Sequence, residues 1–538
     1  MMHTHSLFTR RASLAIAATL AGVSSTFAAV QSWNVDTGDF LDGANWTPGF
    51  VGEWPLDVAE ISNGGTATMS AGVAVLLAIN VGQNGVGLAT GTLIQTGGDL
   101  VMNDGIVVGR QGTAVGVYEM TGGSLTLVNL RIGGGSQNSH GTMTVSGANT
   151  LVISSGTGHT SVGSPGTGML TLENSAVWTH NGANPFLIGS DNNTQGAVGG
   201  NGTLHVLSGA LFDVVGTANF TIGRSNGTGG NGTVLVDGGT INIASGFLNM
   251  AATNAGAGSA GGTGTLTLKS GAISTPLLNL LEGNSTVNFD GGTATLGGIA
   301  KTGVIGSATV NFNGTRVIAQ SSNVNFIAVN GTGSGTLTLN VDAGGLILDT
   351  NDNDIAVAQP FTGAGGLTKV GDGTLTLSGA NGYAGATVVQ AGTLALGADD
   401  VIADASDLTL NSATLDLAGF SDTMGALALD GTATINFGLV PGANSLVFAD
   451  SSGATWSGSL VLENFEVGVD TLSFSDGSGL TLSQLDAIQL AGFTVTGLDA
   501  NGVVQFSAIP EPSQFAMVMV GGLVVVIATA RRRRRANA

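Results

Sequence analysis

The fold is decided by a stretch that recurs along the chain with variations: Gly116-Val-Tyr-Glu-Met-Thr-Gly-Gly-Ser-Leu-Thr-Leu-Val-Asn-Leu-Arg-Ile-Gly133. It holds three short runs in which apolar and polar residues alternate, separated by turn residues. Alternation with a period of two, bounded by glycine turns, is typical of half-buried β-strands. The first steps between copies are 26, 25 and 25 residues, and the copies open at Gly65, Gly91, Gly116, Gly141, Gly168, Gly202, Gly232 and Gly264.

A repeat of this length predicts a stacked array. One copy cannot bury its own apolar face, whereas stacked coils can, at the strand spacing of ~4.8 Å. We therefore expect an all-β fold, a right-handed parallel β-helix (a β-solenoid), over residues 65–320. Insertions such as Asn192–Asn201 and Ala251–Thr263 lengthen later steps, and we expect them to project from one edge of the rod. Copies become irregular from Thr286, where Thr286-Val-Asn-Phe289 is echoed by Thr309-Val-Asn-Phe312.

Composition supports a secreted repeat protein and argues against a nucleic-acid partner. The chain has 538 residues, 90 glycines and 5% aromatic residues, while 42% of it is hydrophobic and alternates regularly, unlike a disordered chain. Residues 29–508 hold seven Lys and Arg against 34 Asp and Glu, a net charge of −27. Such a surface repels phosphates. The absence of cysteine excludes disulfides and thiolate metal sites.

The N-terminal 64 residues divide into two segments. Residues 1–28 have the organisation of a secretory signal: Arg10-Arg11, then the apolar run Ala12–Val23, then the small-residue site Thr26-Phe-Ala28. Residues 29–64 carry three tryptophans, at positions 33, 46 and 54. We interpret them as a cap on the open end of the solenoid, because such an end must be covered. The alternative is that exposed Trp33, Trp46 and Trp54 stack on sugar rings.

Residues 363–397 lie in a continuation of the solenoid that we assign to 321–420. They closely resemble the autotransporter-associated β-strand repeat. The resemblance implies a further β-helix turn of a surface passenger, without a catalytic residue. The matching positions are Leu367, Lys369, Gly371, Gly373-Thr374-Leu375, Leu377-Ser378-Gly379, Asn381, Tyr383, Gly385, Thr387, Val389, Gly392, Leu394 and Leu396.

Residues 421–508 form a predicted C-terminal β-region with a single helical turn within 479–489. The region resembles the β-region that often precedes bacterial PEP-CTERM tails. The tail itself, 509–538, joins Ile509-Pro-Glu-Pro-Ser513 to the apolar run Gln514–Ala530 and to Arg531–Arg535. These three parts in order resemble the PEP-CTERM sorting signal.

The tail predicts that the protein is inserted in a membrane before it is processed. Its apolar run of 17 residues is at the short limit for one transmembrane helix. The arginines that follow would hold that end in the cytoplasm. The resemblance implies that an exosortase-type membrane protease recognises Pro510, Glu511 and Pro512. The alternative is an ordinary tail anchor in which Pro-Glu-Pro is coincidental.

Three arginines form the best candidate for a ligand-binding edge. Arg110 and Arg131 are one coil apart at nearly the same corner, and Arg224 follows Ile222-Gly223 and would extend this basic ladder. A lyase acting on a uronate polymer would need such a base, although the edge can equally be a solvated surface.

Other polar groups give weaker signals. The histidines 140, 159, 180 and 205 lack metal-ligand spacing, and we expect them on the surface or in hydrogen bonds between coils. Asp349–Asp354 resembles a calcium loop, but it lacks the sixth-position glycine and has Pro360 in place of the bidentate glutamate. A solvated polar turn is expected there. The glycine pattern of Gly256–Gly261 lacks the strand-to-helix context of a dinucleotide site.

We assign no catalytic residue, metal or cofactor. The expected function is that of an exported structural or adhesive protein of the cell surface or extracellular matrix, sorted by an exosortase. Association with exopolysaccharide or biofilm is implied by the family resemblance. Two alternatives stay open: a β-helix polysaccharide lyase or glycoside hydrolase, and a carbohydrate-binding surface module.

Overall fold

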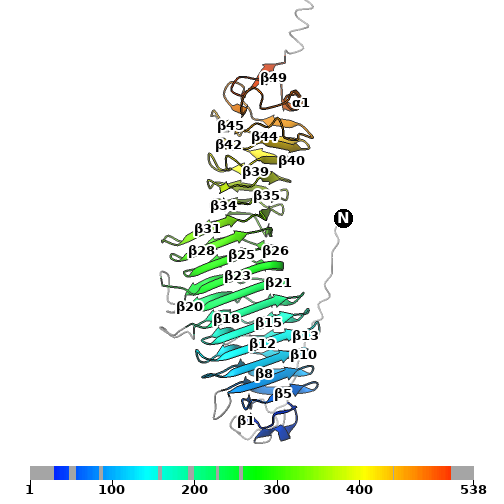
Figure 1. Ribbon diagram of the computed structural model, residues 1–538, viewed down its shortest axis with the longest axis vertical. Helices are drawn as coiled ribbons and strands as arrows, with labels where there is room; N and C mark the ends of the chain where they lie inside the picture. Colours follow the sequence, from blue (N-terminus) through cyan, green and yellow to red (C-terminus); the bar gives the residue numbers. More distant parts are fainter. Residues whose placement is uncertain are drawn as a thin grey trace, which may run out of the picture.

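The computed structural model shows an elongated rod of stacked coils, with the strands lying across its long axis (Figure 1). It describes residues 29–47, 56–83, 89–155, 160–191, 199–225, 229–253, 259–439 and 442–509. Most coils contribute three strands, and each strand pairs in parallel with its counterpart in the next coil. The prediction of an all-β solenoid is therefore confirmed, while its right-handed sense stays a prediction.

The coils build three sheet faces, which we number in chain order. The first face contains β2 (Thr37–Asp39), β5 (Thr66–Met69), β7 (Thr90–Gln95), β9 (Val115–Met120), β12 (His140–Ser146), β15 (Thr167–Glu173), β18 (Asn201–Leu207), the first parts of β21 (Asn231–Ile243) and β23 (Thr263–Thr275), β25 (Asn284–Phe289), β28 (Ser307–Phe312), β31 (Thr336–Val341), β34 (Phe361–Gly363) and β37 (Gly382–Tyr383).

The second face contains the first parts of β6 (Val73–Val81) and β8 (Asp99–Val108), β10 (Gly123–Leu127), β13 (Thr150–Ser154), β16 (Val177–His180), β19 (Leu211–Val214), the second parts of β21 and β23, β26 (Thr293–Leu296), β29 (Arg316–Ala319), β32 (Leu346–Asp349), β35 (Leu367–Val370), β38 (Thr387–Val389), β40 (Leu408–Asn411) and β43 (Leu427–Asp430).

The third face contains β1 (Val30–Trp33), β4 (Val58–Ile61), the second parts of β6 and β8, β11 (Asn129–Gly134), β14 (Thr160–Ser164), β17 (Phe186–Ser190), β20 (Phe220–Ser225), β22 (Leu248–Thr253), β24 (Leu278–Leu280), β27 (Ile299–Lys301), β30 (Asn323–Val329), β33 (Ile355–Val357), β36 (Thr374–Leu377), β39 (Thr393–Leu396), β41 (Thr414–Asp416), β44 (Ala433–Asn436), β46 (Leu460–Glu463) and β48 (Ile488–Leu490).

The opening glycines of the repeat stack on one another. Gly91 pairs with Gly116, and Gly116 with Gly141, across the first face. The same column continues without a register slip to Gly264. The copies read from the sequence are therefore successive coils. The strands that flank the two long insertions, β17 and β18 and then β22 and β23, lie at the same passage from the third face to the first. Residues 192–198 and 254–258 of the insertions lie outside the described residues, so their projection from one edge stays a prediction.

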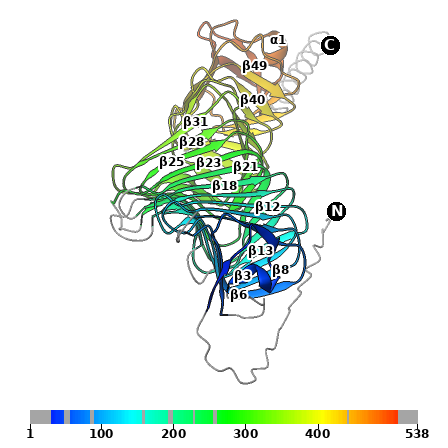
Figure 2. The same cartoon turned by 60° about the horizontal axis from the view of Figure 1, so that its bottom comes forward.

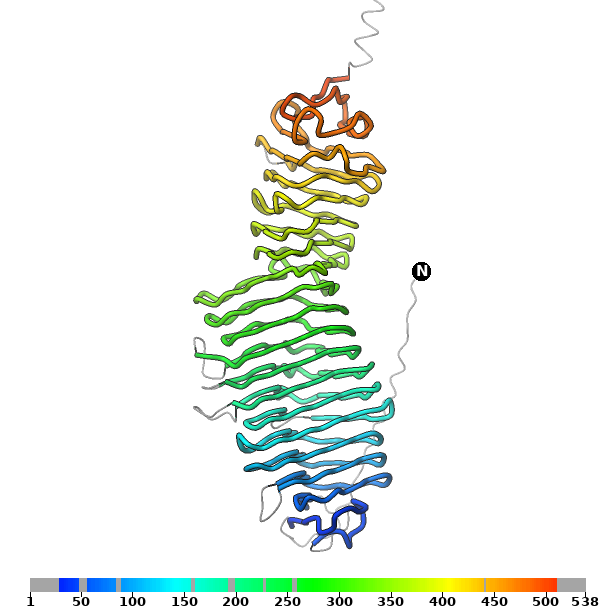
Figure 3. Tube along the Cα trace, in the orientation of Figure 1, coloured from blue at the N-terminus to red at the C-terminus, as the bar shows by residue number. Residues whose placement is uncertain are grey.

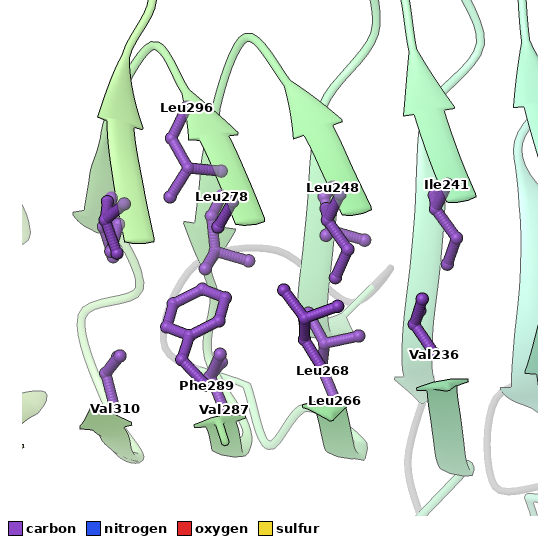
Figure 4. Packing of buried hydrophobic residues seen from close by; sticks show 14 of the residues in the cluster. Val236, Ile241, Leu248, Leu266, Leu268, Leu278, Val287, Phe289, Leu296 and Val310 are labelled. Carbon is purple, nitrogen blue, oxygen red and sulfur yellow. The ribbon is translucent and has the colours of Figure 1, made fainter. Parts of the chain in front are cut away.

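The core runs through the interior as one continuous apolar column. Every second strand residue points inward, as in β12, whose glycine, methionine and valine at alternate positions are buried. In Figure 4, Val236, Leu266, Leu268 and Val287 lie opposite Ile241 and Leu248 across this interior. Burying each such side chain contributes roughly 1.5–3 kcal/mol, so stacking supplies the stability that a single coil lacks.

The irregular region after Thr286 keeps the same pairing. Its two echoed segments lie side by side, residue for residue, in β25 and β28. The rings of Phe289 and Phe312 stack inside with centroids 5.8 Å apart, and Asn311 Nδ2 donates to Asn288 Oδ1 outside at 2.8 Å. Each coil shortens further on, since Leu367 pairs with Thr387 and Thr387 with Leu408. The coils remain stacked at this shorter length (Figure 3).

The N-terminal end is plugged by aromatic side chains. Strand β1 pairs antiparallel with β3 (Trp46–Thr47), which follows the 3-10 turn Gly43–Asn45. The ring of Trp46 lies edge-on to Trp33 and Phe40, with centroids 5.0 and 5.3 Å away, and its Nε1 donates to the Phe40 carbonyl at 2.9 Å. Trp33 and Trp46 are 3% and 2% exposed, so neither can stack on a sugar ring. Trp54 lies outside the described residues.

At the other end the solenoid closes with different elements (Figure 2). The single helical turn is confirmed as α1 (Leu482–Asp486), which begins with a capping box between Thr481 and Gln484. A hairpin of β49 (Phe493–Leu498) and β50 (Val504–Ala508) adds antiparallel strands to the last coil. A separate sheet joins β42 (Asp422–Met424), β45 (Ser445–Phe448) and β47 (Thr471–Phe474).

Among the described residues, none of the helices has the length and apolar character needed to span a membrane. The segment predicted to do so, Gln514–Ala530, lies outside the described residues. So does the predicted signal at 1–28.

Candidate functional site

A polar groove of about 550 Å³ lies on the outer surface of the third face, near the N-terminal end. Four adjacent strands, β4, β6, β8 and β11, and the residues that directly follow β8 and β11 supply its lining. Each of these strands already pairs with a neighbour on both sides. The main chain of the floor therefore has no free edge, and only side chains can select what binds.

The floor of the groove is a column of outward-facing residues. Val58 pairs with Ala78, Ala78 with Gly105, and Gly105 with Asn129. Two small residues in succession leave the surface hollow at this level. Gly105 is also required by the backbone, because a Cβ there would lie 2.0 Å from the carbonyl oxygen of Asn129.

Two arginines form one wall of the groove. Arg131 lies in the neighbouring outward column, where it follows Asn80 and Val107. Its side chain covers Gly134, since a Cβ added there would meet the Cβ and Cδ of Arg131 at 2.7 and 3.3 Å. Arg110 is half-buried at the corner and donates from Nη1 to Gln83 Oε1 at 2.9 Å. Arg110 and Arg131, which the sequence places one coil apart, both line this groove.

Polar residues with oxygen acceptors also line the groove. Asp104 is exposed and accepts a hydrogen bond from the Asn129 amide. Asn80 donates to Glu60 Oε1 at 3.4 Å, which turns its own amide oxygen away from that carboxylate. The groove thus holds two guanidinium groups and one exposed carboxylate, that of Asp104. This combination can hold an anion and hydroxyl groups at the same time.

Arg224 does not join this groove. It lies in the column that starts at Arg110, but Gly134, Ser164 and Ser190 occupy the three positions between them. Burial lowers the pKa of Arg224, and the neighbouring Asp191 carboxylate opposes that shift. The basic ladder expected from the sequence is therefore interrupted after its first two members.

The remaining lysines and arginine are buried, form an ion pair or lie apart from the groove. Lys301 and Lys369 are fully buried, and Arg316 forms an ion pair with Asp349 through Nη2 and Oδ2 at 2.6 Å. Lys269 is exposed at the far corner of β23. Among the described residues, the groove therefore holds two of the few cations that face solvent in this acidic protein.

Ser154 and His180 form a Ser–His pair, but in the wrong environment for catalysis. His180 Nε2 lies 2.9 Å from the Asn184 carbonyl, so it donates there, and Nδ1 accepts from the Ser154 hydroxyl at 2.8 Å. Trp178 Nε1 donates to the same hydroxyl at 3.1 Å. Burial lowers the pKa of His180, which is 0% exposed. The pair joins two coils, as expected, and no substrate reaches it.

The other histidines form no cluster with it. His140 is exposed at the start of β12, and His205 is half-buried in β18, where burial lowers its pKa. His159 lies outside the described residues.

The acidic loop Asp349–Asp354 uses its carboxylates within the chain. Asp349 forms an ion pair with Arg316 and accepts a hydrogen bond from the main-chain N–H of Asn351 at 2.9 Å. Asp354 accepts one from the main-chain N–H of Thr374 at 2.9 Å. In the part of the chain that the structure describes, no group of three or more His, Asp or Glu side chains is arranged to hold a metal. The loop therefore acts as a polar turn that ties neighbouring coils together.

Lys369 is a buried polar centre that the sequence analysis missed. Its ammonium group donates to Thr350 Oγ1 at 3.1 Å, to the Gly371 carbonyl at 2.5 Å and to the Ala391 carbonyl at 3.0 Å. Burial lowers the pKa of Lys369 to about 8, and carboxylates led by Asp349 oppose the shift. The group joins three successive coils. The sequence feature that could have revealed this burial is the alternation in Leu367-Thr-Lys369, because it assigns the lysine to an inward position.

Asn381 and Tyr383 connect coils in the same segment. Asn381 accepts from the Phe361 amide at 2.8 Å and donates to the Val401 carbonyl at 2.8 Å. The buried Tyr383 hydroxyl lies 2.6 Å from Thr387 Oγ1. The positions that carried the sequence resemblance are therefore hydrogen-bonding and core positions of the coil.

The fold and the groove define a parallel β-solenoid with a polar surface site. Residues 367–396 match the passenger-associated-transport-repeat family, within the segment whose resemblance was seen in the sequence. A 110-residue stretch, 20% of the chain, is 32% identical to the adhesin BmaC autotransporter of Brucella suis biovar 1 and covers 3% of that protein. No solved structure matches the chain.

Pro510, Glu511 and Pro512 lie outside the described residues, so the sorting motif has no structural description.

Proposed function

We propose that the chain is an exported structural or adhesive protein of the cell surface or extracellular matrix. An exosortase-type protease sorts it at Pro510, Glu511 and Pro512, and it associates with exopolysaccharide or biofilm. The observation that carries the proposal is the unbroken solenoid that contains the passenger-associated repeat. The similarity to an adhesin autotransporter supports the adhesive role. An extended rod with long regular faces suits adhesion, because it offers a large surface at little cost in stability.

The test of this role measures protein and polymer together. Protein released by producing cells is mixed with the host's own exopolysaccharide and resolved by size-exclusion chromatography. Co-elution with polymer of unchanged length is the expected result, since a matrix protein binds without cleaving. The second candidate function is a polysaccharide lyase, favoured by the Arg110 and Arg131 pair beside Asp104 in one groove. Shortened polymer would replace the proposed function with that one.

The sorting step makes a separate prediction. Pro510→Ala combined with Pro512→Ala removes the motif and leaves the apolar run and the arginines intact. The full-length variant should accumulate in the inner-membrane fraction, because the anchor is present and the cleavage signal is not. Immunoblots of membrane and released fractions measure this. A Ser513→Ala variant is the control. Normal release of the double variant would refute sorting at Pro-Glu-Pro.

A further inference from the structure

We infer that the groove over β4, β6, β8 and β11 binds a sugar that carries a carboxylate, an acidic saccharide of the uronate class. The inference deepens the proposed association with exopolysaccharide and depends on it. It names a site on the rod and the chemistry that this site recognises.

The first argument is the placement of positive charge. Residues 29–508 have a net charge of −27 and seven cations, of which Lys301 and Lys369 are fully buried and Arg316 is paired with Asp349. Arg110 and Arg131 nevertheless face the same groove from adjacent coils. Two guanidinium groups repel each other, so placing them side by side costs electrostatic free energy. An anionic ligand between them removes that repulsion, so the arrangement favours such a ligand. Guanidinium groups match the planar carboxylate in geometry as well as charge.

The second argument is the carboxylate that lines the same groove. Asp104 is exposed and accepts hydrogen bonds from hydroxyl groups, whereas Asn80 is only 2% exposed and the amide oxygen of Asn129 is buried. A simple inorganic anion has no donor for the Asp104 carboxylate. A sugar acid satisfies both kinds of group, because its carboxylate can bind the arginines while a ring hydroxyl donates to Asp104.

The third argument concerns the competing class of ligand, an acidic peptide. Peptides commonly bind sheets by adding a strand to a free edge. The four floor strands are paired on both sides, so no such edge exists in the groove. The hollow above Ala78 and Gly105 is about 550 Å³, within the size range of sites for small molecules and short oligosaccharides.

The experiment measures binding of short oligogalacturonate to the full chain in mild detergent by isothermal titration calorimetry. Arg131→Gln should weaken binding about tenfold, because a hydrogen bond to a charged group is lost. Lys269→Gln removes one exposed positive charge elsewhere and should leave affinity within about twofold, since distant charges are screened. Ala78→Phe fills the floor without changing charge and should abolish binding.

Two chemical controls separate the ligand classes. Methyl-esterified oligogalacturonate keeps the hydroxyl groups and loses the carboxylates, so it should bind about tenfold more weakly. Sulfated dextran oligosaccharides keep negative charge with a different geometry and should also bind more weakly. Equal affinity for either control would overturn the inference, as would an equal loss in Lys269→Gln and Arg131→Gln.

The outcome also separates this inference from the proposed function. If the wild-type protein and Arg131→Gln both co-elute with the host polymer, the matrix role stands and the groove assignment fails. If oligogalacturonate binds through Arg131 while the host polymer is not retained, the groove assignment stands and the matrix role fails. Absence of oligogalacturonate binding by the wild-type protein refutes the groove assignment directly.

Discussion

Replacing Gly202 with alanine should open the solenoid at the coil formed by β17 and β18. Gly202 lies in the column of opening glycines, between Gly168 and Gly232. A Cβ there would lie 2.1 Å from the Val162 carbonyl oxygen and 2.2 Å from the Gly189 amide nitrogen. Both contacts are main-chain atoms of the stacked strands, so neither can move aside as a side chain would. We expect a loss of about 3 kcal/mol, at the upper end for overpacking.

The loss should be local, because each coil of a solenoid contacts only its neighbours. Limited proteolysis with mass spectrometry should therefore place the first new cut in the variant near residues 189–202. Gly382→Ala is the matched control, since nothing lies within 4 Å of an added Cβ there. Equal resistance of the Gly202 variant and the control would show that the glycine column is not required by close packing.

Replacing Lys369 with methionine should destabilise the repeat at 367–396. Methionine keeps an apolar chain of similar length and removes the donor that binds Gly371 and Ala391. Two partly buried carbonyl oxygens then lose a partner, at roughly 1 kcal/mol each. The buried ammonium group no longer has to be desolvated, which offsets part of the loss. We expect a net loss of about 1 kcal/mol in the local stability of these coils.

Hydrogen exchange read by mass spectrometry measures this effect coil by coil. Faster exchange should be confined to the peptides around 350, 371 and 391, the three coils that the ammonium group connects. Lys269→Met is the control, because that lysine is exposed. Unchanged exchange in the Lys369 variant would mean that the buried amine contributes nothing net to stacking.

The sequence was informative about the coil because one coil is a local pattern. Alternation assigned Met143 and Val145 to the core, and the glycine spacing assigned Gly116 and Gly141 to successive coils. The aromatic plug was also foreseen, since an open end has to be covered, and the burial of Trp33 and Trp46 agrees with that.

The groove was only half visible in the sequence. Arg110 and Arg131 were noticed because positive charges are rare in this chain. The groove residues Asp104 and Asn129 carry no motif, and 25 residues separate them. Small outward residues such as Ala78 and Gly105 are a signal that could have revealed the hollow, but only after the closing strands are aligned in their correct register.

The sequence by itself determined the class of fold, the coil period and the corner that accepts insertions, because strand alternation and glycine turns act over a few residues. The tertiary structure alone decided which residues of different coils become neighbours. Stacking register brings Arg131 beside Val107 and Asn80 and places three small residues between Arg110 and Arg224. The physical reason is that side chains on a solenoid surface meet across the ~4.8 Å spacing between coils, whereas the chain between them varies in length.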